Sequence, residues 1–203
     1  GSEMCIRDRL GHCSNESIIC RDEVCYLQVG RTYTNPIISD KSVPDPSVIR
    51  AKDGYFYLYA TQTKTYWMPV YRSKDLVNWE YQGTAFNKAT EPDLPGGGAF
   101  WAPEIRFLNG KYVLYYSWAK MNGADISYTA VAVGDTPMVP FPDSKELIGN
   151  KEFGSNCIDQ FYYEEDGKKY MFFGSFKGIY VTELEDDCLL YTSPSPRDTE
   201  RSR

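Results

Sequence analysis

The sequence has little of what nucleic-acid binding and membrane insertion require. Its 22 basic residues are outnumbered by 28 acidic ones, which gives a net charge of −6. An acidic chain without a basic run is a poor ligand for a phosphate backbone or a charged membrane surface. No apolar run is long enough to span a bilayer, and no signal peptide is visible. The sequence therefore predicts no nucleic-acid partner and no membrane span.

Metal-binding motifs are also lacking. The only histidine, His12, lies beside Cys13, Cys20 and Cys25, but this spacing matches no standard zinc finger or knuckle. No metal site is therefore predicted from these residues.

The two ends of the chain do not resemble structural elements. Residues 1–8 and 188–203 resemble translated sequencing adapter, and we interpret both as non-native. Residues 9–33 lack clear periodicity and are expected to form a poorly defined lead-in. On this interpretation the chain is a truncated fragment, and its parent is a secreted or periplasmic protein whose signal peptide is not included. Finding the end segments in the genomic DNA of the source organism would contradict the interpretation.

Aromatic residues, in contrast, are abundant, with 17 Tyr, 10 Phe and 4 Trp. Tyr and Trp carry both an apolar ring and a polar group, which suits partly hydrated sites such as sugar clefts. For any single Tyr the simpler explanation is that aromatic residues favour β-strands.

An internal repeat organises the rest of the chain. Each copy has an acidic residue, a short apolar run, an Asp-Gly or Asn-Gly pair and an aromatic-rich run. These pairs supply the positive φ angles of tight hairpin turns, so each copy is predicted to be a β-hairpin that opens with its acid. Further strands are expected at 68–73, 79–86, 126–133 and 178–184. The three copies span 45–61, 104–117 and 159–175.

The opening acids Asp45, Glu104 and Asp159 are roughly 55–60 residues apart, which is the length of a four-stranded propeller blade. We therefore predict an all-β chain with about three β-propeller blades over 34–187. A β-sandwich would not explain the matching acids, and β-helix repeats are much shorter.

In a propeller the first strand of each blade lines the central channel, so the three acids are expected to face one axial pocket. Like charges gathered there raise one another's pKa, and carboxylates with unequal pKa values suit acid–base cleavage of a glycosidic bond. The alternative is that each acid caps a loop or accepts hydrogen bonds from backbone amides.

Several motifs resemble those of family 43 glycoside hydrolases, and the resemblance covers about residues 34–187. Within that family the chain is most similar to bacterial arabinan endo-1,5-α-L-arabinosidases. The resemblance implies a five-bladed β-propeller that cleaves α-L-arabinofuranosyl linkages with inversion. The motifs are 35–38, 43–49 with its Pro-Asp-Pro, 72–80, the Trp-Ala-Pro-Glu of 101–104, and Ile158 with Asp159.

The resemblance also implies roles for individual residues. Asp45 corresponds to the general base and Asp159 to the residue that modulates the pKa of the acid. Trp101, Glu104 and Asn156 are expected to bind substrate, with Glu104 at the position in blade two that matches the other two acids.

Two features depart from the family pattern. Gln160 stands where the family usually has proline after the modulator, which is expected to change local stiffness. The general-acid glutamate belongs to a further blade, so this fragment is expected to be inactive.

The expected partner is a plant cell-wall polysaccharide or oligosaccharide. No cofactor is required, and an axial calcium ion is expected only in the intact parent, because His12 lies too early in the chain to be the late histidine ligand. Two alternatives stay open. One is a β-xylosidase or exo-arabinofuranosidase of the same family, and the other is a non-catalytic carbohydrate-binding propeller.

Overall fold

The computed structural model describes most of the chain between residues 16 and 185. The segments interpreted as non-native, 1–8 and 188–203, lie outside the described residues, as do His12 and Cys13. Among the described residues, no helix has the length and apolarity needed to cross a membrane. The described residues are 16–21, 24–29, 33–39, 41–95, 98–120, 126–138, 140–142, 144–149, 153, 156–175 and 178–185.

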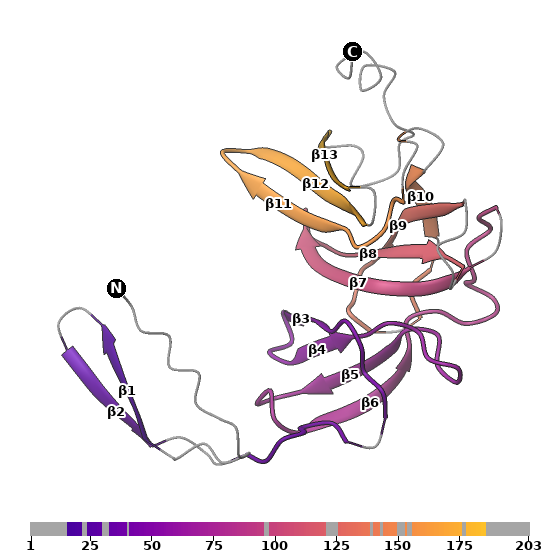
Figure 1. Ribbon diagram of the computed structural model, residues 1–203. Coiled ribbons are helices and arrows are strands. Elements are labelled where there is room, and N and C mark those ends of the chain that lie inside the picture. Colours follow the sequence, from indigo (N-terminus) through magenta and orange to yellow (C-terminus); the bar gives the residue numbers. More distant parts are fainter. Residues whose placement is uncertain are drawn as a thin grey trace.

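The strands form four antiparallel sheets (Figure 1). One is the hairpin of β1 (Glu16–Arg21) and β2 (Val24–Val29), which lies apart from the other sheets and within the segment expected to be a lead-in. The other three sheets follow one another along the chain and each runs as a simple meander, as expected of propeller blades.

Each blade is built from consecutive strands. Blade one contains β3 (Ser47–Arg50), β4 (Phe56–Tyr59), β5 (Pro69–Ser73) and β6 (Trp79–Thr84). Blade two contains β7 (Ala99–Leu108), β8 (Lys111–Ala119), β9 (Ser127–Gly134) and β10 (Ser144–Gly149). Blade three contains β11 (Phe161–Glu165), β12 (Lys168–Ser175) and β13 (Gly178–Leu184).

The predicted hairpins are confirmed. Gly54, Gly110 and Gly167 have φ angles of 85°, 82° and 75°, and a turn glycine joins the first two strands of each blade. Asn109 and Asp166, which precede two of these glycines, also have positive φ, as a type I′ turn requires. The predicted later strands are present as β5, β6, β9 and β13, whereas β10 was not predicted.

Blade two is buried on both faces. Tyr112, Leu114 and Tyr116 of β8 pack in one cluster with blade one, while the alternating residues Val113 and Tyr115 pack in a second cluster with blade three. Successive residues of a strand point to opposite faces, so one strand serves both clusters. The sequence of β8 is accordingly apolar almost throughout, without the polar alternation of a half-exposed strand.

The first cluster is an aromatic seam between blades one and two. Phe86, after β6, stacks on Phe100 of β7 with ring centroids 4.4 Å apart, and both rings are fully buried. Tyr116 and Trp118 of β8 contact Phe100 at 5.4 and 4.9 Å. Stacked and edge-on aromatic pairs add to the burial of apolar area, so this seam holds the two blades in a fixed relation.

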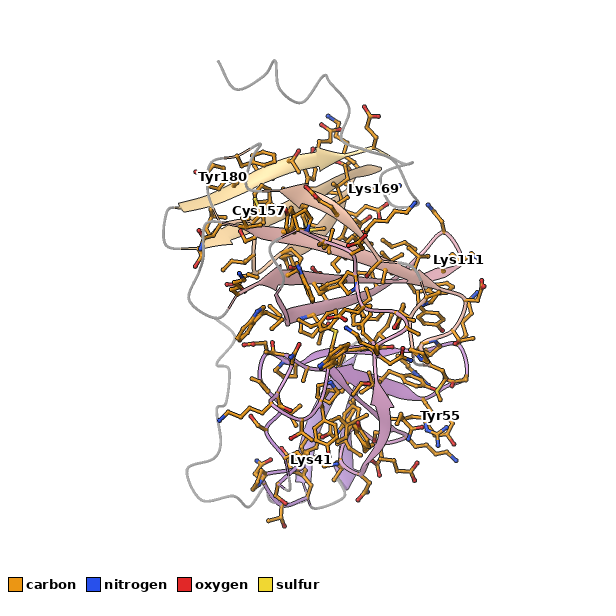
Figure 2. The ribbon with its side chains drawn as sticks, turned by 90° about the vertical axis from the view of Figure 1, so that its right-hand side faces the viewer. Lys41, Tyr55, Lys111, Cys157, Lys169 and Tyr180 are labelled. Carbon is orange, nitrogen blue, oxygen red and sulfur yellow. The ribbon has the colours of Figure 1, made fainter. Side chains whose placement is uncertain are left out.

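The second cluster joins blades two and three. Met171 and Phe173 of β12 and Tyr162 of β11 are buried there against blade two. The buried Cys157 and the partly buried Tyr180 also belong to this cluster, and both are labelled in Figure 2. The opposite face of blade three exposes apolar side chains, among them Phe161, Tyr163, Phe172, Ile179 and Val181.

A strap from blade two crosses to blade one through residues 135–138 and 140–142. The Phe141 ring enters the first cluster, and its N–H donates to the Ala85 carbonyl at 2.7 Å. The Tyr59 hydroxyl donates to the Pro137 carbonyl at 2.6 Å, and burial raises the pKa of Tyr59 well above its usual range. The strap therefore adds a second connection between the two blades.

The 72–80 motif forms the β5–β6 turn. Asp75 accepts hydrogen bonds from the N–H groups of Val77 and Asn78 and from the hydroxyl of Ser73. These bonds, the backbone N–H of Asn78 first among them, hold the pKa of Asp75 well below its usual range. This motif is held by its own local hydrogen bonds. This part of the family resemblance therefore reflects the structure of a turn.

Replacing Phe100 with alanine should open a cavity in the aromatic seam. The substitution Phe100→Ala is expected to lower the free energy of unfolding by about 3–5 kcal/mol. The matched control is Phe172→Ala, because Phe172 is 38% exposed whereas Phe100 is 1% exposed. The control should cost roughly 1 kcal/mol or less in the same urea titration. Equal losses would contradict the assignment of the seam as the main contact between these blades.

Candidate functional site

Three residues at the start of the blades have left-handed backbone conformations. The φ angles of Asp45, Ala102 and Asp159 are 50°, 38° and 55°. A left-handed conformation costs a non-glycine residue roughly 1–2 kcal/mol, somewhat less for Asp than for Ala. Such strain persists only where surrounding contacts enforce it, and it is concentrated at functional sites.

Hydrogen bonding shows that these three residues are structurally equivalent. The residue before Asp45, Pro44, accepts from the N–H of Thr61 at 3.0 Å, and the residue before Asp159, Ile158, accepts from the N–H of Gly174 at 2.8 Å. In blade two the residue before Ala102 is Trp101, and it pairs with Ser117 of the second strand in the same way. Ala102 is therefore the counterpart of Asp45 and Asp159 in blade two.

The expectation that Glu104 takes this place is corrected by the register. Glu104 lies two residues after Ala102, so it corresponds to Ser47 in blade one. The spacing to the turn glycine agrees with this correction, because Ala102 and Asp159 each lie eight residues before their glycine and Glu104 lies six before it. A β-bulge in β7 between Trp101 and Glu104 interrupts the pairing at this point.

Glu104 instead connects two blades, as Ser47 does. The Ser47 hydroxyl accepts from the N–H of Ile105 in the next blade at 3.1 Å, and Glu104 Oε2 accepts from the N–H of Tyr162 in the next blade at 2.8 Å. The other oxygen, Oε1, accepts hydrogen bonds from Nη2 and Nε of Arg106 at 2.6 and 2.9 Å. Burial raises the pKa of Glu104, while the Arg106 and Tyr162 bonds oppose that effect.

Asp45 and Asp159 form an electrostatically coupled pair. Both side chains reach solvent. Partial burial raises the pKa of Asp159, and the negative charge of Asp45 raises it further. The Thr61 hydroxyl donates to Asp45 Oδ2 at 2.6 Å and thereby fixes the orientation of that carboxylate. Blades one and three thus bring two carboxylates of unequal environment to one place, as acid–base chemistry requires.

The remaining predicted substrate contacts are half-buried. Trp101 donates its indole N–H to the carbonyl of Ala119 at 2.8 Å, which fixes the ring while leaving part of it accessible. Asn156 lies three residues before Asp159 and directly before the buried Cys157. Roles for Trp101, Asn156 and Glu104 in binding substrate stay predictions.

Three residues of the site were not singled out from sequence as contacts of the acids: Thr61, Ser117 and Gln160. The Ser117 hydroxyl accepts from the N–H of Asp159 at 2.8 Å, much as the Thr61 hydroxyl accepts from the N–H of Ala102 at 2.8 Å. A signal for the two hydroxyls was present, because each follows the turn glycine of its hairpin at the same interval.

Nothing in the described part of the chain indicates a metal centre. No group of three or more His, Cys, Asp or Glu side chains among the described residues is arranged to hold a metal ion. The donor set for an axial calcium ion is therefore not found there, and no chemical step is assigned to one.

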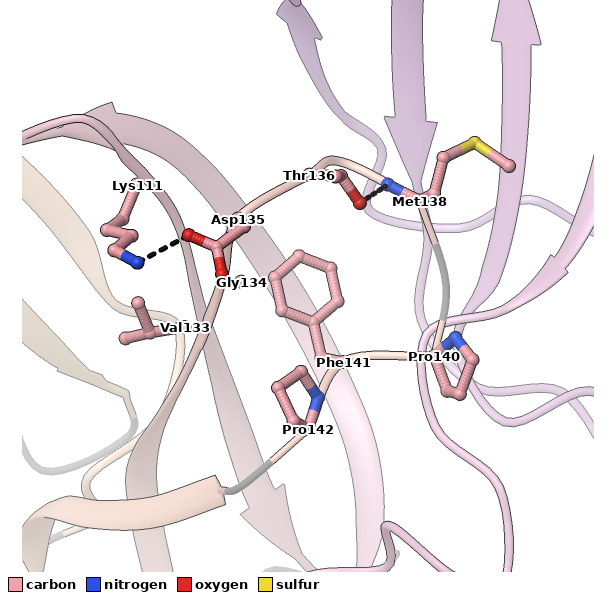
Figure 3. A pocket seen from close by; sticks show the side chains of 9 residues that line it. All are labelled: Lys111, Val133, Gly134, Asp135, Thr136, Met138, Pro140, Phe141 and Pro142. Carbon is pink, nitrogen blue, oxygen red and sulfur yellow. Dashed lines mark hydrogen bonds and ion pairs between the residues drawn. The ribbon is translucent and has the colours of Figure 1, made fainter.

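A pocket of about 240 Å³ lies at the other end of blade two (Figure 3). Its lining includes Phe141 of the strap and the ion pair of Lys111 with Asp135. Lys111 begins β8 and Ser117 lies six residues further along it, a rise of roughly 20 Å, so the pocket is remote from the two acids.

Comparison with known proteins agrees with this arrangement. Residues 33–201 match glycosyl hydrolases family 43. The chain belongs to this family. The predicted family membership is confirmed.

Relatives in the family carry several activities in their names. The chain is 29% identical over 160 residues to a probable arabinan endo-1,5-α-L-arabinosidase A of Aspergillus fumigatus, covering 75% of this chain and 48% of the relative. It is 31% identical over 149 residues to a putative β-xylosidase of Escherichia coli, covering 68% of this chain and 25% of the relative. The chain thus spans half or less of the length of these relatives.

Solved structures of the family share the fold. The structure of Cellvibrio cellulosa α-L-arabinanase matches with a TM-score of 0.63 and 33% identity, over 73% of this chain and 50% of that chain. A structure of the same arabinanase complexed with arabinohexaose matches with a TM-score of 0.62 and 31% identity, over 74% and 50%. The prediction of a partial five-bladed β-propeller is confirmed.

The coupling of the two acids predicts a pKa change. Asp45→Asn removes a negative charge beside Asp159, so the pKa of Asp159 should fall toward that of an ordinary aspartate. A carbon-13 NMR titration of the Asp159 carboxyl carbon measures this shift. Asp135→Asn serves as the control, because Asp135 pairs with Lys111 at the remote pocket. An unchanged Asp159 pKa in Asp45→Asn would contradict the pairing.

The interblade bonds of Glu104 predict a loss of stability. Glu104→Ala leaves the N–H of Tyr162 without its acceptor and Arg106 without its partner, and should lower the free energy of unfolding by roughly 1–3 kcal/mol. Glu165→Ala, at an exposed position of β11, should change it by about 0.5 kcal/mol or less. Similar values for both variants in chemical denaturation would contradict the assigned role.

Proposed function

We propose that the protein containing this chain hydrolyses α-L-arabinofuranosyl linkages of arabinan with inversion at the anomeric carbon. The observation that carries the proposal is the coupled pair of Asp45 and Asp159, which have unequal surroundings and are both open to solvent. A site of this kind suits glycosidic cleavage, in which carboxyl groups of different pKa take different roles in proton transfer.

In the proposed mechanism Asp45 is the general base. Its carboxylate accepts a proton from water, and the resulting hydroxide adds to the anomeric carbon from the face opposite the leaving group. Hydrogen bonding from Thr61 leaves the second oxygen of Asp45 for this task. Asp159 keeps the pKa of the proton donor raised through its charge and also orients the donor.

The proton donor is proposed to be a glutamate outside the described residues. It protonates the glycosidic oxygen as the bond to the anomeric carbon breaks. We therefore expect the 203-residue chain alone to bind arabinan oligosaccharides with little or no turnover, since acid catalysis contributes roughly 10²–10⁴-fold.

The proposed substrate is a plant cell-wall polysaccharide or an oligosaccharide derived from it, which suits a secreted or periplasmic protein. Trp101 is the proposed stacking platform, because its ring is fixed through the indole N–H and partly accessible. Asn156 is the further proposed contact, and Glu104 is proposed to support the substrate site through its bond to Tyr162. No cofactor is required by this mechanism.

A β-xylosidase or exo-acting arabinofuranosidase is the second candidate. The similarity to the putative β-xylosidase of Escherichia coli supports it, at 31% identity. A shared pair of acids serves either substrate, and the substrate is decided by loops around the site.

Substrate and mechanism can be tested together on the longer protein that contains this chain. We expect release of arabino-oligosaccharides from linear arabinan, and a fall in kcat of roughly 10²–10⁴-fold in Asp45→Asn. Proton NMR of the anomeric signal at early times distinguishes inversion from retention.

The matched control for this experiment is Asp135→Asn, which should retain activity because Asp135 lies at the remote pocket. Activity on xylo-oligosaccharides alone would favour the second candidate. Binding of sugar by the longer protein without hydrolysis of either substrate would favour a carbohydrate-binding propeller.

A further inference from the structure

The side-chain amide of Gln160 bridges two blades beside the acid pair. Its Nε2 donates to the carbonyl of Ala102 at 2.5 Å, and its Oε1 accepts from the hydroxyl of Ser117 at 3.0 Å. The side chain is 6% exposed, so these bonds are made away from water. A buried amide that lost either partner would carry a desolvation cost, which makes both bonds strongly preferred.

The bridge belongs to a continuous set of bonds between the two acids. From Asp45 the set passes to the Thr61 hydroxyl, which accepts from the N–H of Ala102. The carbonyl of the same Ala102 accepts from Gln160. From Gln160 it passes to the Ser117 hydroxyl, which accepts from the N–H of Asp159. Gln160 is thus the connection between the half of the set that holds Asp45 and the half that holds Asp159.

Two physical demands meet at this point. The two carboxylates repel each other, and the turns that carry them have left-handed backbones that relax unless they are held. The strands themselves end beside these turns, since β3 begins at Ser47 and β11 at Phe161. Backbone bonds at Pro44 and Ile158 hold each turn to its own blade, and the bonds of this set that cross from blade to blade are made by side chains.

We propose that Gln160 is a positioning residue whose side-chain amide holds the Asp45 and Asp159 turns at a fixed separation against the mutual repulsion of their carboxylates. The proposal rests on the proposed function only in that it treats this pair as the catalytic pair. The geometry it describes can be tested without turnover. A proline at this position, as in the family pattern, has no amide with which to make either bond.

The test is a double-variant cycle on the 203-residue chain. The fall in the Asp159 pKa caused by Asp45→Asn measures how strongly the acids are coupled, because charge coupling weakens with distance. This fall is measured by carbon-13 NMR with Gln160 present and again in Gln160→Leu. We expect the fall in Gln160→Leu to be less than half of that in the parent chain.

A second variant keeps the proposal testable if Gln160→Leu does not fold. Thr61→Val removes the hydroxyl at the other end of the set with little change in shape, and it should also reduce the coupling by at least half. Thr61→Ser keeps the hydroxyl and should restore it. Dispersed amide spectra show which variants are folded.

The matched control is Gln82→Leu, because the side chain of Gln82, in β6 of blade one, donates to the carbonyl of Glu80 on the same strand. It should leave the coupling unchanged. Full coupling in a folded Gln160→Leu or Thr61→Val chain overturns the proposal. Loss of coupling with no arabinan hydrolysis in the longer protein would instead sustain the positioning role and contradict the proposed function.

Discussion

The burial of blade two on both faces is the constraint on which the rest of the structure depends. Alternate residues of β8 enter two different clusters, so blades one and three are both fixed by the same strand. Polar groups that enter these seams lose water and have to find protein partners. The seams therefore carry specific hydrogen bonds in addition to aromatic packing, and those bonds lie next to the acids.

The bonds across the seams follow a repeated plan. Ser47 in blade one and Glu104 in blade two each accept an N–H from the first strand of the next blade. Thr61 and Ser117 each accept the N–H of the left-handed residue that opens the next blade. Chemically different side chains thus do the same work, since only an acceptor at the right place is needed.

The plan also explains why the acids have different environments. In blade two the left-handed position is Ala102, so it contributes backbone bonds without a charge. Only blades one and three place carboxylates there, and burial and the charge of Asp45 raise the pKa of Asp159. Blade two, which has the uncharged Ala102 at the equivalent position, therefore lies between the two blades that carry the acids.

The sequence by itself determined the hairpins, most of the strands and the two acids Asp45 and Asp159, because turn glycines and alternating apolar runs act locally. Only the tertiary structure decided that Glu104 belongs to a seam, because its carboxylate accepts from the N–H of Tyr162, which belongs to another blade. It also decided that Gln160 joins the halves of the site, since its partners Ala102 and Ser117 come from another blade. Contacts between blades depend on register and packing across distant segments, which no local pattern encodes.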